Sequence, residues 1–516
     1  MLSTSWRWGV IVSLVMVLGL AGNGVVPGRD LYVAPNGSPQ SDGSPGKPLD
    51  LDTVLSDKSP AKPGDTIYLQ GGRYDGPMGK TESGVPRRIS FTPQISGAPG
   101  KPIVIASAPG QQAHLNGTLA LGSTQYVQWV RLEIGDLNWD PLRQKHFNDT
   151  AVNTGGAGLK VINCNIFGGA MGMGVWRPAI DLEVYGTLIH DFGYYHDQLR
   201  GSGHAAYIQN EQGTKRFEHN IAYRGCGWNY DIYTQGGEIK GIDLIENIGY
   251  IASWHKPGQV GFNFGLTGWK PAERIRFIGN VGYHSRSAEQ PWRSNMRLMA
   301  SKPGAFHQDA VVKDNYMAGT FRALVLSRWQ NIEVTGNTLW ATDFLTEISS
   351  APSGSGIDSN PPRPELNNYR VDHNTYYDNG NPRPFVYSAH ENALDEEQLS
   401  FAQWQALGLD KHSRMLPGRD GRPTGTKVFV FPNKVEKGRA NVAIFNWDGL
   451  EKVEVDVSRA LSPGRKYKVY NCLDVKQTLA LARPVLAGTY AGGLLPFPMR
   501  QDASSPDFDA FLVLPE

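Results

Sequence analysis

The sequence contains little cysteine: three residues, Cys164, Cys226 and Cys472, in a chain of 516. Three cysteines exclude a framework of several disulfides, and an odd number leaves at least one thiol free in a monomer. Their spacing also fits no zinc knuckle. The fold must therefore be stabilised by a large apolar core, which a chain of this length can build.

An excess of charge of either sign is also missing. Lysine and arginine number 50, aspartate and glutamate number 49, and the net charge is +1. No charge asymmetry indicates a nucleic-acid-binding protein, and so small a net charge gives little long-range steering. We therefore expect no nucleic-acid partner.

The sequence has no long apolar run. A run over residues 9–21 follows Arg7 and is followed by small residues. It is shorter than the roughly 20 residues of a membrane-spanning helix. The pattern predicts a secretory signal peptide over residues 1–24, a secreted or periplasmic location, and no stable membrane insertion after cleavage. An uncleaved N-terminal anchor is the alternative.

Glycine (60), proline (34), tyrosine (21) and tryptophan (13) are abundant. This composition is typical of many strands joined by many turns. Short segments with one shared pattern recur, such as "KRFEHNIAYRG", "RIRFIGNVGYH" and "NIEVTGNTLWA". Each has alternating apolar residues, then asparagine, then an apolar or aromatic pair. The asparagines are Asn165, Asn220, Asn247, Asn280, Asn315, Asn337 and Asn374, and Gly186 takes the same place in one further segment.

The spacing of these segments predicts stacked coils. The smallest gap is near 21 residues and the excess varies, as expected of coils of fixed length with loops of free length. Alternation with period two makes each segment a strand. An asparagine repeated at a strand end predicts a ladder of side chains that bond the coils above and below. We therefore interpret these asparagines as architectural and expect a parallel β-helix.

These coils, together with the opening "LYVAPNGSPQSDGSPGKPLDLDTVL", resemble right-handed β-helix proteins of the pectate-lyase-like superfamily. The resemblance implies an all-β fold: a right-handed parallel β-helix (a solenoid) over residues 30–390. It says little about substrate, because the superfamily includes lyases, hydrolases, epimerases, esterases and binding proteins.

Two further units follow the coils. Residues 391–424 contain apolar residues at helical spacing, which predicts a helical capping segment and linker over the end of the solenoid. In residues 425–516, short segments of alternating apolar and polar residues are separated by turns such as "SPGR". This pattern predicts a small antiparallel, β-sandwich-like domain.

The strands that precede the asparagine segments carry polar side chains at alternate positions. If Ile208, Ile232, Phe262 with Phe264, and Leu298 point into the core, then alternate residues point outward. Stacking then predicts an outward row of Tyr207, Asp231, Asn263 and Arg297, and a second row of Gln209, Tyr233, Gly265 and Met299. A row with a phenol, a carboxylate, an amide and a guanidinium favours a binding cleft over a merely solvated face.

Loops that enter this face add aromatic and basic side chains. Tryptophan suits the apolar faces of sugars, while arginine and lysine suit carboxylate or sulfate groups. His204 lies where one loop becomes a strand and is the first candidate for a catalytic base or acid. Asn210 and Lys215 lie in the turn beyond that strand, where Lys215 either reaches the cleft edge or stays solvated. The predicted substrate-binding residues are Gln209, Asn210, Lys215, Tyr233, Trp254, His255, Asn263, Trp292 and Arg293.

The function that this pattern favours is elimination from an acidic, uronate-containing polysaccharide. Such a lyase needs a cation to take charge from the substrate carboxylate and a base to remove the adjacent proton. Arg297 is predicted for the first role and His204 or Tyr207 for the second, with Asp231 as the fourth catalytic candidate. No metal or cofactor is predicted, although calcium could replace the arginine.

Two alternatives stay open. A glycoside hydrolase needs two carboxyl groups about 5–9.5 Å apart, and the predicted row offers only Asp231 unless loops supply a second acid. A non-catalytic, carbohydrate-binding surface protein is the third class. We expect a monomer whose partner is a polysaccharide.

Overall fold

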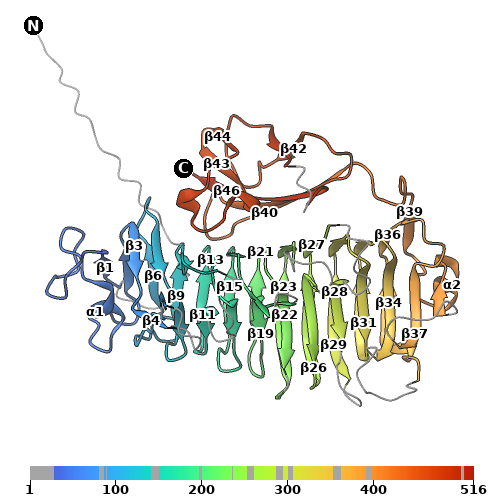
Figure 1. The fold of residues 1–516 in the computed structure, drawn as a ribbon, viewed down its shortest axis with the longest axis horizontal. Helices are drawn as coiled ribbons and strands as arrows, with labels where there is room; N and C mark the ends of the chain where they lie inside the picture. The colour runs from blue at the N-terminus through green and yellow to red at the C-terminus, as the bar shows by residue number, and fades with distance from the viewer. Residues whose placement is uncertain are drawn as a thin grey trace, which may run out of the picture.

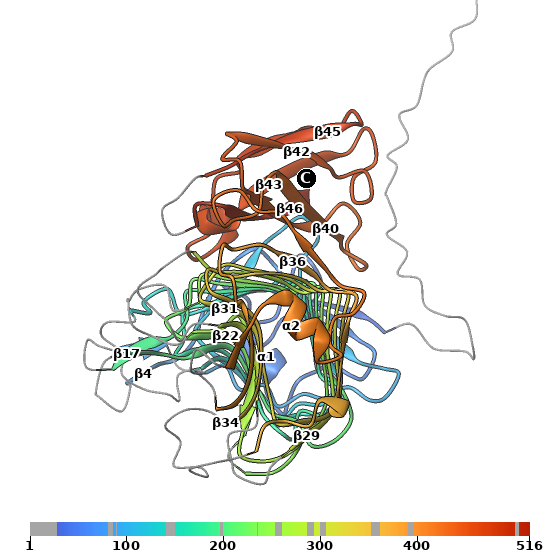
Figure 2. The same ribbon diagram turned by 90° about the vertical axis from the view of Figure 1, so that its right-hand side faces the viewer.

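The computed structural model describes residues 28–80, 86–88, 90–140, 150–196, 200–234, 236–252, 261–285, 294–299, 306–351, 362–390, 397–500 and 505–516. Over these residues the chain winds into a three-sided parallel β-helix, and a smaller β domain packs along one side (Figures 1 and 2). The predicted all-β fold with a parallel solenoid and a small antiparallel C-terminal region is confirmed. The predicted signal peptide at 1–24 lies outside the described residues. Within them, no helix is both long and apolar enough to span a bilayer.

Each coil gives one strand to each of three sheets. Sheet I contains β1 (Asp30–Val33), β2 (Thr66–Leu69), β6 (Ile103–Ser107), β9 (Val127–Val130), β12 (Lys160–Ile162), β15 (Glu183–Tyr185), β20 (Lys215–Glu218), β23 (Ile239–Ile245), β26 (Ala272–Ile278), β29 (His307–Lys313), β32 (Trp329–Thr335) and β35 (Tyr369–Asp372). Sheet II contains β3 (Gly72–Asp75), β7 (Ala113–Asn116), β10 (Glu133–Gly135), β13 (Asn165–Phe167), β16 (Leu188–His190), β21 (Ile221–Tyr223), β24 (Ile248–Tyr250), β27 (Val281–Tyr283), β30 (Tyr316–Ala318), β33 (Thr338–Trp340), β36 (Thr375–Tyr377) and β39 (Arg414–Leu416).

Sheet III contains β8 (Leu119–Leu121), β11 (Thr150–Thr154), β14 (Met171–Val175), β19 (His204–Ile208), β22 (Trp228–Thr234), β25 (Phe264–Gly268), β28 (Ser294–Met299), β31 (Arg322–Ser327), β34 (Phe344–Ala351), β37 (Phe385–His390) and the antiparallel β38 (Gln398–Leu399). Two hairpins leave the coils: β4 (Met78–Lys80) with β5 (Pro86–Arg88), and β17 (Tyr194–His196) with β18 (Arg200–Ser202).

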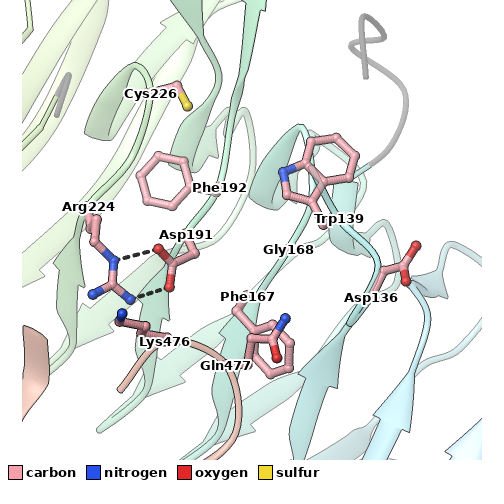
Figure 3. Close-up of a pocket in the computed structure, with 10 residues that line it drawn as sticks. All are labelled: Asp136, Trp139, Phe167, Gly168, Asp191, Phe192, Arg224, Cys226, Lys476 and Gln477. Carbon is pink, nitrogen blue, oxygen red and sulfur yellow. Dashed lines mark hydrogen bonds and ion pairs between the residues drawn. The ribbon is translucent and has the colours of Figure 1, made fainter. Parts of the chain in front are cut away.

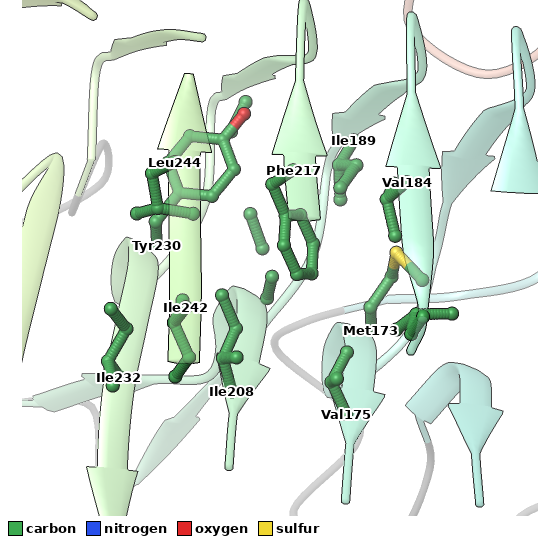
Figure 4. Close-up of a cluster of buried hydrophobic side chains, with 14 of the residues drawn as sticks. Met173, Val175, Val184, Ile189, Ile208, Phe217, Tyr230, Ile232, Ile242 and Leu244 are labelled. Carbon is green, nitrogen blue, oxygen red and sulfur yellow. The ribbon is translucent and has the colours of Figure 1, made fainter. Parts of the chain in front are cut away.

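The interior of the solenoid is filled by apolar side chains in stacked rows. Val175, Ile208 and Ile232 of sheet III pair rung by rung and face Phe217 and Leu244 of sheet I (Figure 4). All five are fully buried. Alternate residues of a strand point to opposite faces of the sheet. Because Ile208 and Ile232 point into the core, the residues that precede them, Tyr207 and Asp231, point outward. This interior packing fixes which side chains face outward on sheet III.

An amide ladder runs along the corner between sheets I and II, as predicted. Each Nδ2 donates to the next Oδ1 at 2.8–3.1 Å, from Asn220 through Asn247, Asn280, Asn315 and Asn337 to Asn374. The predicted members Asn165 and Gly186 are wrong by one residue. Thr187 and Cys164 continue the ladder, because the Thr187 amide donates to Asn220 and the Cys164 amide to Thr187. The residue before each ladder position has a positive φ, and Gly186 is one of these.

Both ends of the solenoid carry a short helix. Helix α1 (Leu51–Leu55) begins at the cap Asp50, whose carboxylate accepts from the Thr53 amide. Helix α2 (Phe401–Ala406), within the segment predicted to cap the coils, begins with a capping box of Ser400 and Gln403. Its Trp404 is fully buried and stacks on Phe385 at 5.1 Å. Helix α2 therefore covers the apolar end of the coils (Figure 2).

The C-terminal domain covers the outer face of sheet II. Its strands are β40 (Thr426–Pro432), β41 (Ala440–Asn446), β46 (Phe508–Pro515), β43 (Lys466–Asn471) and β44 (Leu486–Thr489) in one antiparallel sheet, and β42 (Lys452–Asp456) with β45 (Leu494–Pro498) in another. Short 3-10 helices lie in this domain at Cys472–Asp474 and Leu479–Leu481, and a third, Leu366–Asn368, precedes β35 in the coils. Phe508 packs 5.1 Å from Tyr250 and 5.0 Å from Tyr283 of sheet II. The C-terminal domain therefore covers sheet II, whereas sheet III forms a different side of the solenoid (Figure 2).

Candidate active site

An outward column of side chains crosses sheet III. The register pairs Tyr207 with Asp231, Asp231 with Gly265, and Gly265 with Arg297. Three of the four predicted members thus share one column, which we call the outer column. Asn263 does not belong to it, and Gly265, predicted for the second row, takes its place. Arg297 therefore stands two rungs from Asp231, about 10 Å along the sheet at the usual strand spacing.

Asn263 is instead part of a second, shorter amide ladder. Its Nδ2 donates to Asn295 Oδ1 at 2.9 Å and to the Tyr283 carbonyl at 3.0 Å, and its Oδ1 accepts from Asn229 at 2.8 Å. The side chain is fully buried. The interpretation of Asn263 as a substrate-binding residue is therefore corrected to a structural role. The error arose because Phe262 was placed in the core, whereas it stacks on Trp228 at 4.9 Å.

The imidazole of His204, the first residue of β19, lies next to the carboxylate of Asp231 on the neighbouring strand β22 of sheet III. Nδ1 of His204 is 3.3 Å from Oδ2 of Asp231, and the side chains are 9% and 1% exposed. The approach does not make a hydrogen bond. Neither Asp231 oxygen, nor His204 Nδ1, has a hydrogen-bond partner among the residues the structure describes. A buried carboxylate without donors costs folding free energy, which makes Asp231 a candidate for a chemical role.

Burial sets the protonation of both groups. It lowers the pKa of His204 to about 3, since the imidazolium is not solvated there. It raises the pKa of Asp231 well above the ordinary carboxyl range for the same reason. Because Oδ2 faces Nδ1, Asp231 is placed to accept from the tautomer that carries its proton on Nδ1. That tautomer leaves the lone pair on Nε2, as a general base requires.

Aromatic rings line the same face over successive coils. Tyr207 lies 5.6 Å from Trp176 and 6.0 Å from Tyr233, measured between ring centroids, and 5.3 Å from the ring of His204. Gln209 donates to the Tyr207 hydroxyl at 3.4 Å. Burial raises the pKa of Tyr207 to about 12, so the phenol keeps its proton at neutral pH. The predicted Gln209 and Tyr233 lie beside Tyr207, and this row of tilted rings suits the apolar face of a sugar.

Asn210 and Lys215 do not face the cleft. Both are fully buried. Asn210 Nδ2 donates to the carbonyls of Gly213 and Gly241 at 3.2 and 3.0 Å. Lys215 Nζ donates to the carbonyls of Trp176 and Gln209, each at 2.5 Å, and burial lowers its pKa to about 7. Their predicted substrate-binding role is corrected: both satisfy backbone carbonyls at the corner where sheet III turns into sheet I.

The remaining predicted residues are in the loops that enter the face. Trp254, His255, Trp292 and Arg293 lie outside the described residues.

Several residues of the face were missed in the sequence. The ring of Trp228 lies 4.9 Å from that of His204, and Trp176 is the neighbour of Tyr207 on the preceding coil. Glu347 continues the outer column two rungs beyond Arg297, where it forms a buried ion pair with Arg322 at 2.8 Å. The alternating pattern of "FLTEISS" was the signal that could have placed Glu347 there. Four rungs separate Glu347 from Asp231, about 19 Å at the usual strand spacing.

A cavity of about 400 Å³ lies elsewhere, between the edge of sheet II and the C-terminal domain (Figure 3). Its lining residues are Asp136, Trp139, Phe167, Gly168, Asp191, Phe192, Arg224, Cys226, Lys476 and Gln477. Arg224 pairs with both oxygens of Asp191 and also donates to the carbonyls of Leu473 and Val475 at 2.8 and 2.7 Å. These contacts fasten the C-terminal domain to the coils, so Arg224 and Asp191 are already used in docking.

No family model matches the chain, and no curated protein matches it. Among solved structures it is similar to pectate lyase Pel9A, with 14% identity over 65% of this chain and 80% of that one, at a TM-score of 0.43. It is also similar to a lacto-N-biosidase from Eubacterium ramulus, with 11% identity over 76% of this chain and 67% of that one, at a TM-score of 0.39. A third similar structure is a mannuronic acid-specific polysaccharide lyase from human gut microbiota, with 13% identity over 76% of this chain and 92% of that one, at a TM-score of 0.36. At these identities the similarity concerns the fold alone.

Proposed function

We propose that the protein is a carbohydrate-active enzyme, a lyase that cleaves an acidic, uronate-containing polysaccharide by β-elimination on the outer face of sheet III. The observation that carries the proposal is the buried His204–Asp231 pair, whose facing atoms lie 3.3 Å apart beside the ring of Tyr207. A secreted or periplasmic location, predicted from residues 1–24, belongs to the same proposal.

Each group has one role in the elimination. Nε2 of His204 removes the proton next to the uronate carboxyl group, and Asp231 holds the imidazole in the tautomer that can accept it. Arg297 neutralises the substrate carboxylate and so makes that proton more acidic. The electron pair forms the new carbon–carbon double bond as the glycosidic bond breaks. The leaving oxygen takes a proton from the Tyr207 hydroxyl, whose raised pKa keeps the proton available.

The distances along the column support elimination over hydrolysis. The register neighbours of Asp231 are Tyr207 and Gly265, neither of which is acidic. Glu347, about 19 Å away, is beyond the 6.5–9.5 Å that an inverting hydrolase needs between its carboxyl groups. A hydrolase would therefore require an acid from the loops.

The experiment is an assay of the full chain against a panel of uronate-containing and neutral polysaccharides, with and without a chelator. We expect a product that absorbs in the ultraviolet, because elimination leaves a conjugated double bond. His204→Ala should fold normally and lose activity by about 10²–10⁴-fold, whereas His390→Ala, on β37, should keep it. New reducing ends without ultraviolet absorbance would indicate a hydrolase, and binding without turnover would indicate a carbohydrate-binding protein. Loss of activity with chelator would transfer the role of Arg297 to calcium.

A further inference from the structure

Two histidines and one aspartate converge at the C-terminal end of the solenoid, far along the chain from the candidate active site. Asp372 ends β35, His373 follows it at the corner, and His412 lies in the turn between α2 and β39. One nitrogen of each imidazole and one carboxylate oxygen lie within 4.8 Å of one another. From this geometry we infer that Asp372, His373 and His412 form a binding site for a divalent transition metal, with Zn²⁺ as the best fit.

The carboxylate of Asp372 is fixed in place by the backbone. Its Oδ1 accepts from the main-chain amides of His373 at 2.8 Å and His412 at 2.7 Å. Its Oδ2 is thereby turned toward both imidazoles, 2.6 Å from Nδ1 of His412 and 3.5 Å from Nδ1 of His373. A ligating carboxylate held by hydrogen bonds through its other oxygen is the arrangement that orients metal ligands in proteins.

The two histidines are held by adjacent rungs of the coil. His373 has a φ of 57° in the left-handed corner position, directly before the ladder residue Asn374. The turn that carries His412 continues that ladder: Asn374 Nδ2 donates to Asp410 Oδ1 at 3.0 Å, and the Asn374 amide donates to Ser413 Oγ at 2.7 Å. The imidazole rings lie 5.2 Å apart at 28°. The ligands are thus presented by a rigid frame instead of by free loops.

The spacing and chemistry suit a tetrahedral ion. Metal–ligand bonds of 2.0–2.1 Å imply about 3.3 Å between neighbouring ligand atoms. The distance from His373 Nδ1 to Asp372 Oδ2 is already close to that value. The distance from His412 Nδ1 to the same oxygen would have to grow by only about 0.7 Å. Both imidazole side chains are 69% exposed, so an ion can enter and water can take the fourth position. Two nitrogen ligands favour zinc, copper or nickel over calcium and magnesium.

A bound ion would link the last strand of sheet I to the segment that follows helix α2. It would therefore hold the cap against the end of the coils, and it would raise thermal stability because it binds the folded chain alone.

The test is calorimetric titration of the untagged, chelator-treated chain with Zn²⁺, together with its melting temperature with and without the ion. We expect one Zn²⁺ per chain with micromolar or tighter affinity and a higher melting temperature. His373→Ala, His412→Ala and Asp372→Asn should each weaken binding at least tenfold and remove the rise. His390→Ala, in the same terminal region, is the matched control and should bind like the wild type.

Two results would overturn the inference: no stoichiometric binding to the wild type, or binding that the three variants leave unchanged. Because both histidines are exposed, the variants should retain the circular dichroism spectrum of the wild type. Should a variant misfold, the wild type loaded with Co²⁺ gives a second readout, since visible bands typical of tetrahedral nitrogen and oxygen ligation support the site and octahedral bands contradict it.

Discussion

Oδ2 of Asp231 lies 3.3 Å from Nδ1 of His204, and both side chains are buried on the outer side of sheet III. The strands β19 and β22 that carry them are neighbours, with Tyr207 directly opposite Asp231. Residues 27 positions apart in sequence are thus one rung apart in space. The stacking of coils creates the pair, and the predictions below test what the pair does.

Asp231→Asn should separate stability from activity. The amide replaces a buried carboxylate that has no hydrogen-bond partner among the described residues, so we expect stability to stay equal or to rise by about 1–3 kcal/mol. Activity should fall by at least tenfold, because the amide no longer favours the tautomer with the lone pair on Nε2. Urea unfolding and turnover measured on the same preparation check both parts. A stable variant with full activity would remove Asp231 from the mechanism.

The activity should rise with pH. Burial raises the pKa of Asp231, so this carboxyl group keeps its proton to a higher pH than an ordinary aspartate, and it supports His204 fully only after losing it. Burial also raises the pKa of Tyr207 to about 12, so the proton donor persists through the alkaline range. We expect kcat/KM to increase above the ordinary carboxyl range and to stay high to at least pH 10. A decline between pH 7 and 10 would contradict the assigned roles.

The middle of the amide ladder should be sensitive to truncation. Asn280 donates to Leu244 O and Asn315 Oδ1 and accepts from Asn247, all inside the corner of the coil. Asn280→Ala removes these three buried hydrogen bonds, which should lower the free energy of unfolding by about 2–4 kcal/mol. Asn138→Ala, at an exposed position, should change it by less than about 0.5 kcal/mol. Equal stability of the two variants would show that the ladder contributes little.

Docking of the C-terminal domain should depend on pH through Glu133. Its Oε1 accepts from the Leu479 amide at 2.5 Å, and burial raises its pKa to about 7. A carboxyl group whose pKa is raised in the folded state stabilises the folded chain fully at pH values below its unfolded pKa. That contribution is lost as the pH rises toward 7. Relative to Glu133→Gln, the wild type should therefore lose stability between about pH 4.3 and 7. A difference between the two that does not change with pH would contradict this.

The periodic part of the structure could be predicted from the sequence, and the irregular part could not. Alternation and the recurring asparagine predicted the coils, because core packing forces one pattern on every rung. The exact register was harder: Asn263 lies two residues before the column position, since the glycine at position 265 left no side chain to mark the place. Lys215 and Asn210 read as exposed turn residues, yet each is buried against carbonyls at a corner. Which polar groups a corner must satisfy depends on the neighbouring coil, and a single strand does not reveal it.

The most direct test of the account is a crystal structure of the inactive His204→Ala variant with a bound uronate oligosaccharide. The account predicts sugar density over Tyr207 and Tyr233 on sheet III, with one carboxylate on Arg297 and the reacting carbon facing the vacated imidazole position. Density confined to the cavity beside Trp139, or to the C-terminal domain, would contradict it.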